Sequence, residues 1–413
     1  RWQQLKPEFK YMRYLVILFI VLSACQSSSN KKTEPKTFNE IHEESILIDG
    51  HNDFLLLLTD SLVLEYTKNT FALDKDLTGK THIDLARLKE GGVDVQFFSV
   101  FCLGGQINPF YFANRQIDSL EAIISRNPDK IVKAVNTDEL LKGVEQKKTV
   151  AMIGLEGGHM IEDDLGKLDI LFNRGVRYMT LTWNNSTAWA TSASDETSNN
   201  DLQPKGLNAF GKQVVERMNE LGMLVDVSHL GEQSFWDVIN TTTKPIIASH
   251  SSVYELCNHR RNLKDDQIKA IAENDGVIQV NFSPAFLDKS FKKKSDAFFE
   301  KHKDENDSLV KIFKDEWIVE FHLYRKYIDE ANEIRPPLSI LIDHIDYIVN
   351  LVGVNHIGIG SDFDGITITP QQLNDATNFP LITKALLDRG YTISDIDKIL
   401  GGNVLRALKA NEI

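Results

Sequence analysis

The amino-acid sequence predicts a closed (β/α)8 barrel, an α/β fold of the TIM-barrel type. Apolar, β-branched runs recur eight times, and amphipathic helical patterns separate them. These runs are apolar almost throughout, which is typical of parallel strands buried on both faces. Polar residues gather where the runs end, on the face where such barrels keep their active sites. An open doubly wound sheet is the alternative arrangement.

The composition is that of an ordinary globular protein, with 413 residues of which 42% are hydrophobic and 25% charged. This length can hold two or three domains, but α/β barrels often run this long as a single domain. The formal net charge of −13 argues against nucleic acid as a partner and against adhesion to anionic lipid through a basic surface.

The N-terminal segment has the layout of an export signal. Arg13 precedes the apolar stretch "YLVILFIVLSAC", which is too short to span a bilayer and ends in small residues. We expect residues 1–24 to be a signal peptide that starts at Met12, with residues 1–11 as an upstream artefact.

Cys25 closes the motif "LSAC", which resembles a bacterial lipobox with a lipidated cysteine. An ordinary signal peptide with an incidental cysteine is the alternative. Residues 25–39 would then be the lipidated cysteine and a flexible polar tether. This predicts a protein of the bacterial cell envelope, anchored to a membrane and facing the periplasm or exterior. Cys102 and Cys257 are expected to be buried free thiols, with a disulfide between them as the alternative in an exported protein.

Residues 40–413 are predicted to form a single catalytic barrel. Its strands are expected at residues 46–53, 93–101, 149–158, 176–183, 222–230, 245–252, 276–282 and 356–365. A long polar loop is expected at residues 184–205, after the fourth strand. A charge-rich helical insertion is expected near residues 287–336, and a lid or a subunit contact is its alternative role.

Side chains that can bind a metal follow five of these strands. They are His51 and Asp53 on the first strand, Glu156 on the third, His229 on the fifth, His250 on the sixth, and Asp362 or Asp364 on the eighth. Each alone fits a structural role, but together they indicate a site for Zn²⁺ or a similar divalent ion. Three histidines and two or three carboxylates exceed the ligands of one catalytic zinc, so two ions are expected, with Glu156 able to bridge them.

Five motifs occur in one order: "IDGHNDF", "GLEGGH", "DVSHL", "SHSS" followed by "RRN", and "GSDFDG". Through them nearly the whole chain after residue 40 resembles the membrane (renal-type) dipeptidases, peptidase family M19 of the amidohydrolase superfamily. The resemblance implies a dipeptidase with two zinc ions per chain, which hydrolyses free dipeptides through a metal-bridged hydroxide and tolerates a D-residue at the C-terminal position. It also suggests a homodimer.

The resemblance implies roles for the strand-end residues. His51, Asp53 and Glu156 would hold one zinc, and Glu156, His229 and His250 the other. Asp362 would take a proton during attack and pass it to the leaving amine, with Asp364 as the fallback assignment.

Three more residues are assigned to the substrate. Arg261 matches the family's anchor for the substrate carboxylate, which its guanidinium can bind through two parallel hydrogen bonds. Trp183 stands where the animal enzymes have a histidine, and an indole can donate one hydrogen bond but cannot carry a proton. The substrate's acyl side is therefore expected to be held differently, by Asn184 or by a zinc alone. His159 and Asp226 fit either a support of the ligands or ordinary core hydrogen bonding.

Two alternatives remain beside the dipeptidase. Another amidohydrolase reaction, on an N-acyl amino acid or a lactam, could use the same centre, since Arg261 suits any substrate with a free carboxylate. A non-catalytic binding lipoprotein is the alternative from a different class.

Overall fold

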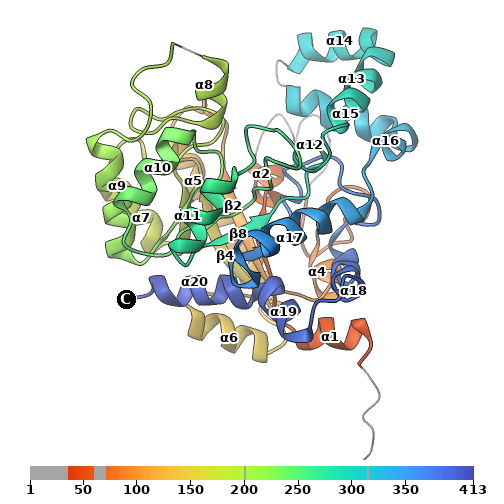
Figure 1. Ribbon diagram of the computed structural model, residues 1–413, viewed down its shortest axis with the longest axis horizontal. Helices are drawn as coiled ribbons and strands as arrows, with labels where there is room; N and C mark the ends of the chain where they lie inside the picture. Colours follow the sequence, from red (N-terminus) through yellow and green to blue (C-terminus); the bar gives the residue numbers. More distant parts are fainter. Residues whose placement is uncertain (1–35, 60–70, 200, 314–315) are drawn as a thin grey trace, which may run out of the picture. The chain divides into compact units, whose positions relative to one another are not determined.

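Eight parallel strands close into a barrel in this computed structural model, which describes residues 36–59, 71–199, 201–313 and 316–413 (Figure 1). The barrel lies in the unit Phe38–Ile413. Hydrogen-bonded neighbours follow the order β2-β1-β9-β8-β7-β6-β5-β4, and pairing between β2 and β4 closes the ring. The prediction of a closed barrel is confirmed, and the open doubly wound sheet is wrong.

The strands agree with the predicted runs, apart from one addition. They are β1 (Leu47–Asn52), β2 (Val93–Phe101), β3 (Ile131–Lys133), β4 (Thr149–Glu156), β5 (Val176–Thr180), β6 (Leu224–Asp226), β7 (Ile247–Ala248), β8 (Val277–Val280) and β9 (Ile357–Ile359). The addition is β3, which pairs with the first residues of β4, while β5 pairs with the later ones. Three residues carry too little pattern to be recognised as a strand.

Helices surround the barrel and connect its strands. They are α1 (Phe38–Glu44), α2 (Phe54–Thr59), α4 (Leu85–Glu90), α5 (Pro109–Arg126), α6 (Thr137–Glu145), α7 (Leu165–Asn173), α9 (Ala209–Leu221), α10 (Glu232–Thr241), α11 (Asp265–Glu273), α17 (Leu338–Val352), α18 (Pro380–Asp388), α19 (Ile393–Asp397) and α20 (Asn403–Asn411). Residues at the helix ends determine where these helices begin and end, as in α9. The Asn208 side chain accepts hydrogen bonds from the first turn, and Gly222, at φ 77°, ends the helix in the left-handed region.

The segment after β8 forms a helical lobe, seen at the upper right of Figure 1. It consists of α12 (Pro284–Leu287), α13 (Phe291–Lys301), α14 (Lys303–Phe313), α15 (Glu316–Lys326) and α16 (Ile328–Ile334). Phe298, Leu323 and Tyr324 belong to an apolar cluster of its own, separate from the barrel core.

The polar segment 184–205 contains a short helix that the sequence did not predict, α8 (Ala193–Ser198). Ser192 begins it, because its side chain accepts a hydrogen bond from the backbone N–H of Asp195.

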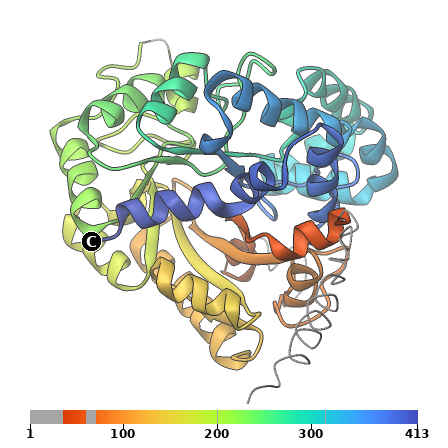
Figure 2. The same cartoon turned by 60° about the horizontal axis from the view of Figure 1, so that its bottom comes forward.

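One end of the barrel is closed by α20, which crosses the amino-terminal ends of the strands (Figure 2). Val404, Ala407 and Leu408 of α20 pack with interior residues such as Ile48 and Val277. We refer to this apolar layer as the barrel floor; its buried members are Ile48, Val95, Phe97, Ala134, Leu140, Val150, Met152, Tyr178, Leu224, Ile247, Val277, Val404, Ala407 and Leu408.

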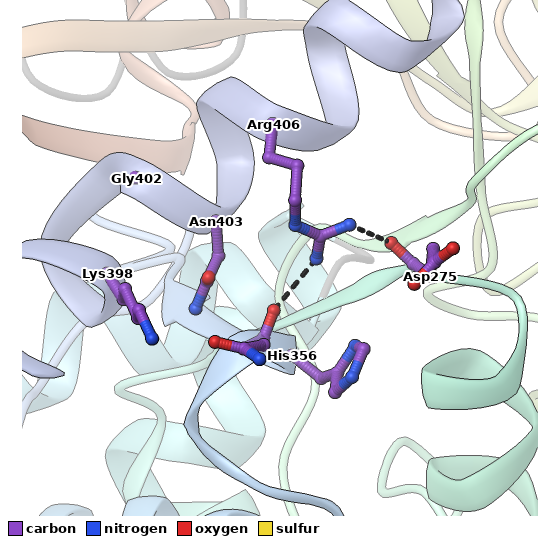
Figure 3. A pocket seen from close by; sticks show the side chains of 7 residues that line it. Asp275, His356, Lys398, Gly402, Asn403 and Arg406 are labelled. Atoms are coloured by element: carbon purple, nitrogen blue, oxygen red, sulfur yellow. Dashed lines mark hydrogen bonds between the residues drawn. The ribbon is translucent and has the colours of Figure 1, made fainter.

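A hollow of about 390 Å³ lies beside α20, lined by residues that include His356, Lys398 and Arg406 (Figure 3). The guanidinium of Arg406 donates to the backbone carbonyls of Asp275 and Asn355 at 2.7 and 2.8 Å. Through these two hydrogen bonds Arg406 holds α20 against the barrel.

The predicted signal peptide and Cys25 lie outside the described residues. Among the residues that the structure describes, no helix combines the length and apolarity needed to cross a bilayer. Cys102 and Cys257 are both buried.

Candidate metal centre

Six predicted metal-site residues lie together at the carboxyl ends of the strands. They are His51, Asp53, Glu156, His229, His250 and Asp362, and every one of them is buried. The strands β1 and β4 end at or beside the first three residues, and β6, β7 and β9 lead into the loops that carry the others. Parallel strands of a barrel bring these ends to one face, so residues far apart in sequence meet there.

Glu156 lies at the middle of the group. Its Oε2 is 3.4 Å from Nε2 of His51. Its Oε1 is 2.9 Å from Nε2 of His229 and 3.6 Å from Nε2 of His250. The carboxylate therefore faces histidines from both halves of the site, the position that a bridging ligand needs.

Two overlapping sets of ligand atoms lie close enough to surround ions. The atoms of His51, Glu156 and His250 lie within 4.8 Å of one another, and so do those of His51, Asp53 and Asp362. Each set combines imidazole nitrogen with carboxylate oxygen, the donors that suit zinc and related divalent metals.

The second ring nitrogen of each histidine fixes its tautomer. Nδ1 of His51 lies 2.7 Å from the Tyr178 hydroxyl, which itself donates to the carbonyl of Gly50. With the hydroxyl proton on that carbonyl, Nδ1 of His51 is the donor to the hydroxyl oxygen, and Nε2 faces the site.

The other two histidines follow the same rule. Nδ1 of His229 lies 3.2 Å from Oδ1 of Asn184, which can only accept. Nδ1 of His250 lies 2.7 Å from the Ser249 hydroxyl, which donates to a carboxylate. The Ser249 contact leaves Nε2 of His250 unprotonated and facing inward, 3.0 Å from Nε2 of His229.

The site also holds buried polar atoms without partners. Among the described residues, Nε2 of His51 and Oδ1 of Asp53 are buried without any hydrogen-bond partner. A buried polar atom left unpaired costs about 1–3 kcal/mol. Divalent ions would satisfy these atoms and separate the two facing nitrogens, so the residues present fit a metal centre.

The electrostatics of the site favour ligation at neutral pH. Burial lowers the pKa of His229 to about 3, helped by the charge of Arg261, and it holds the pKa of His250 well below its usual range. Both rings are therefore neutral, as a ligand must be. Burial opposes ionisation of Glu156, but His51 and His229 outweigh it and hold the pKa of that carboxyl well below its usual range.

His51 shows where positive charge is favoured. Burial lowers its pKa, yet Tyr178, Asp53 and Glu156 outweigh burial and raise the pKa well above the usual value. The carboxylates of Asp53 and Glu156 each lie 3.4 Å from its Nε2. A cation is therefore stabilised at this atom, whether it is a proton or a metal ion that displaces one.

Asp362 and its neighbour Asp364 have different surroundings. Asp362 accepts a hydrogen bond from the Asn281 amide at 2.8 Å and belongs to the ligand group, whereas Asp364 accepts from the backbone N–H of His82 at 2.6 Å. Burial and the charge of Asp53 raise the pKa of Asp362 to about 8. Of the two acids the sequence offered at this position, Asp362 lies in the ligand group and Asp364 does not.

The backbone around the site is locally strained. His229, Asp362 and Asp364 have φ values of 66°, 60° and 67°, in the left-handed region that residues with a Cβ seldom adopt. Gly365 makes room for the acids, because a Cβ there would lie 2.1 Å from Oδ2 of Asp53 and 2.6 Å from Oδ1 of Asp362.

Arg261 lies at the edge of the centre. Its side chain is buried, with Nη2 at 3.2 Å from the carbonyl of His250 and Nη1 at 3.4 Å from the Ser251 hydroxyl. Burial lowers its pKa to about 10, so the group remains cationic at neutral pH. Its Nε has no hydrogen-bond partner in the described part of the chain. A buried cation with a free donor is suited to an anionic ligand.

Trp183 and Asn184 follow β5 at the rim of the centre. The Trp183 ring is half-buried and lies 5.0 Å from the Phe101 ring and 6.4 Å from the His229 ring, measured between centroids. The side-chain oxygen of Asn184 lies 3.2 Å from Nδ1 of His229, so this residue contacts a predicted metal ligand, and its role towards the substrate stays a prediction.

Tyr178, Ser249 and Asn281 were missed in the sequence because each resembles an ordinary strand or loop residue. Gly154, in the neighbouring strand, is a sequence feature linked to Tyr178. A Cβ at this glycine would lie 1.9 Å from the tyrosine ring, so the glycine leaves room for that ring. His159 contacts the carbonyl of Cys102 at 3.1 Å, so it lies beside the site and outside the ligand group.

Comparison with known proteins gives concordant results. The family model described as membrane dipeptidase (peptidase family M19) matches residues 36–413. An uncharacterised dipeptidase of Schizosaccharomyces pombe is 31% identical over 400 residues, which cover 93% of this chain and 84% of that protein.

Solved structures share the fold. A probable dipeptidase of Pseudomonas aeruginosa has a TM-score of 0.69 at 26% identity, covering 91% of this chain and 97% of that one. A metallopeptidase of Rhodobacter sphaeroides, crystallised with a phosphinate mimic of the dipeptide L-Ala-D-Ala, has a TM-score of 0.70 at 23% identity, covering 89% of this chain and 100% of that one.

Proposed function

The chain belongs to the membrane dipeptidases, peptidase family M19, and from this premise we propose that it hydrolyses free dipeptides with two zinc ions held at the carboxyl ends of its strands. One observation carries the proposal. Three histidines point their Nε2 atoms at the carboxylate of Glu156, at 2.9 to 3.6 Å, next to a buried arginine whose Nε has no hydrogen-bond partner in the described part of the chain.

The residues divide into two overlapping ligand sets. His51, Asp53 and Glu156 would hold one ion, and Glu156, His229 and His250 the other. Bound there, divalent ions would lower the pKa of water and polarise the scissile carbonyl. The donor set, nitrogen and carboxylate without cysteine, supports zinc as the metal.

Other residues of the chain act on the substrate. Arg261 would hold its terminal carboxylate through the unpartnered Nε and the neighbouring amino groups. Asp362 would accept a proton during attack and deliver it to the departing amine; a nearby metal charge would draw its pKa below about 8, towards the working pH. Trp183 would form an aromatic wall on the acyl side with Phe101.

A panel of small substrates tests this proposal. The purified protein is given L-Ala-L-Ala, L-Ala-D-Ala and N-acetyl-Ala-Ala, each with and without a chelator. We expect chelator-sensitive cleavage of the two free dipeptides only, including the one with a D-residue. Cleavage of the acetylated compound would assign the centre to N-acyl amino acids instead. No cleavage of any compound by zinc-loaded protein would contradict the substrate class.

We also propose export and anchoring through a lipid on Cys25, on the motif "LSAC" alone. The protein would then face the periplasm or exterior, where short peptides from the cell wall are available substrates. Mass spectrometry of the protein made in a bacterium tests this: an acyl mass on Cys25, absent in Cys25→Ser, supports the anchor. Removal of the signal peptide without an acyl group on Cys25 would contradict the lipid anchor. A homodimer, suggested by the family resemblance, is tested by light scattering.

A further inference from the structure

Asp226 is a buried carboxylate beside the centre that the ligand sets do not use. It ends β6, its side chain is fully buried, and all of its acceptor positions are occupied. Oδ1 accepts from the backbone N–H groups of Ser249 and Ser228 at 2.8 and 3.0 Å. Oδ2 accepts from the hydroxyls of Ser249, at 2.6 Å, and Thr180. No lone pair is left for a metal ion.

The bond to the Ser249 hydroxyl determines the state of His250. A hydroxyl has one proton, and here it is donated to Asp226, the nearest and the only charged acceptor in contact with it among the described residues. The oxygen must then accept from Nδ1 of His250 at 2.7 Å. That histidine is thereby fixed with its proton on Nδ1 and its lone pair on Nε2.

The bond to the Ser228 backbone acts on the other histidine. It closes a turn two residues long, the kind of turn that an Asp side chain stabilises by accepting from its own chain. His229 follows directly, with the left-handed φ of 66°. One carboxylate thus supports both histidines whose Nε2 atoms lie 3.0 Å apart.

From this geometry we infer that Asp226 is a positioning residue for the half of the centre formed by His229 and His250, setting the tautomer of one and the backbone turn of the other. The inference rests on the proposed metal centre for its purpose. Its structural part, the tautomer of His250, can be measured without any metal or substrate.

Asp226→Asn is the sharpest variant, because it keeps the shape and reverses the polarity. The amide nitrogen would donate to the Ser249 hydroxyl, which would then donate to Nδ1 of His250 and move the ring proton to Nε2. A protonated Nε2 cannot bind a metal. We expect about 10–100-fold weaker affinity for zinc at one of two sites, the range typical when a ligand loses its hydrogen-bond support.

Two measurements test this. In the metal-free protein, ¹⁵N chemical shifts of His250 report the tautomer, with Nδ1–H expected in the wild type and Nε2–H in Asp226→Asn. In zinc titration, two ions per chain are expected for the wild type and one tight ion for the variant. Ser249→Ala keeps the carboxylate and removes the hydroxyl that connects it to His250, so it should also weaken one site. This variant tests the inference even if Asp226→Asn fails to fold.

Thr180→Val is the matched control, since it removes a different hydroxyl from Oδ2 of Asp226 and leaves the connection to Ser249 intact. We expect it to retain two tight ions. Unchanged tautomer and unchanged zinc affinity in both Asp226→Asn and Ser249→Ala would overturn the inference. A wild type that binds no zinc while His250 shows the expected tautomer change would contradict the proposed function instead.

Discussion

At the carboxyl ends of its strands the barrel interior holds His51, Glu156 and His250, whereas at the opposite end it holds Ile48, Val150 and Leu408. Both layers are buried, and the same strands supply most of each. Among the described residues, the upper layer contains buried polar atoms without hydrogen-bond partners, while the barrel floor consists mainly of apolar side chains packed together. The comparison suggests a division between the two ends of the barrel. A substitution in the upper layer should mainly change activity, and one in the barrel floor should mainly change the free energy of unfolding.

Tyr178 is the exception that connects the two layers. Its ring packs among the apolar residues of the barrel floor, and its hydroxyl contacts Nδ1 of His51. Burial raises the pKa of that hydroxyl further above its usual range, so it stays protonated and can act only as a hydrogen-bonding group. The following four changes test how complete the separation is.

The largest effect is expected from Glu156→Gln in the upper layer. The amide would present N–H groups to the histidines and lose the charge shared by both ligand sets. We expect zinc content to fall at both sites and kcat/KM for a dipeptide to fall about 1000-fold or more, while the melting curve of the metal-free protein keeps its shape. Glu162→Gln, at an exposed carboxylate nearby, should leave activity intact. Full activity of the Glu156→Gln protein would contradict the proposal that the residues of this layer carry out the reaction.

Leu408→Ala tests the barrel floor. This side chain is 5% exposed and packs against the strand interior. Its truncation leaves a cavity and should lower the free energy of unfolding by about 2–5 kcal/mol. Activity per folded molecule should not change. Chemical denaturation measures the first and kinetics at low temperature the second, with Leu141→Ala, a half-exposed position on α6, as the control. Lost activity in a folded variant would show that the layers are coupled.

Tyr178→Phe should divide its effect between the layers. The ring remains in place, so the free energy of unfolding should fall by about 1 kcal/mol. His51 loses the partner of its Nδ1, and zinc affinity should weaken about 10–100-fold. Tyr324→Phe removes a comparable buried hydroxyl in the helical lobe, 2.7 Å from Ser295, and should leave zinc affinity unchanged. Equal zinc affinities for all three proteins would mean that the hydroxyl does not orient His51.

The smallest effect is a pH-dependent gain in stability from Asp94→Asn, at the start of β2. Burial raises the pKa of Asp94 from 3.8 to about 6. A raised carboxyl pKa means that the folded state holds the proton more tightly, so stability from this group is present below pH ~4 and is lost as the pH rises through about 6. The amide can still accept from the backbone N–H of Leu47.

We therefore expect Asp94→Asn to be more stable than the wild type by about 1–2 kcal/mol at pH 8, and by less at pH 5, in thermal unfolding. Asp49→Asn is the contrasting control. Its carboxylate accepts from Gln96 and twice from Ser361, so replacing it should destabilise the protein. If Asp94→Asn is more stable than the wild type by the same amount at both pH values, the gain comes from packing and not from removal of the carboxylate charge.

The fold was accessible from the sequence because parallel buried strands leave long apolar runs, and because "GHND" and "SHSS" place polar residues where those runs end. The finer arrangement was not accessible. In the sequence Tyr178 looks like an ordinary aromatic core residue. Only the barrel, which brings β1 and β5 together, shows that its hydroxyl contacts His51. The contact between Asn184 and His229 could not be predicted either, because 45 residues separate them in the chain.

The position of α20 near the end of the chain also affects how the protein folds during synthesis. Ile48 lies in β1, near the start of the barrel, while Val404 and Leu408 follow every strand in the chain. A chain synthesised from its N-terminus therefore leaves the barrel floor open to water until residues 403–411 have been made. Contacts this distant in sequence form slowly, and the uncovered apolar surface can aggregate meanwhile. The helix that closes the barrel thus also sets how long the growing chain needs protection.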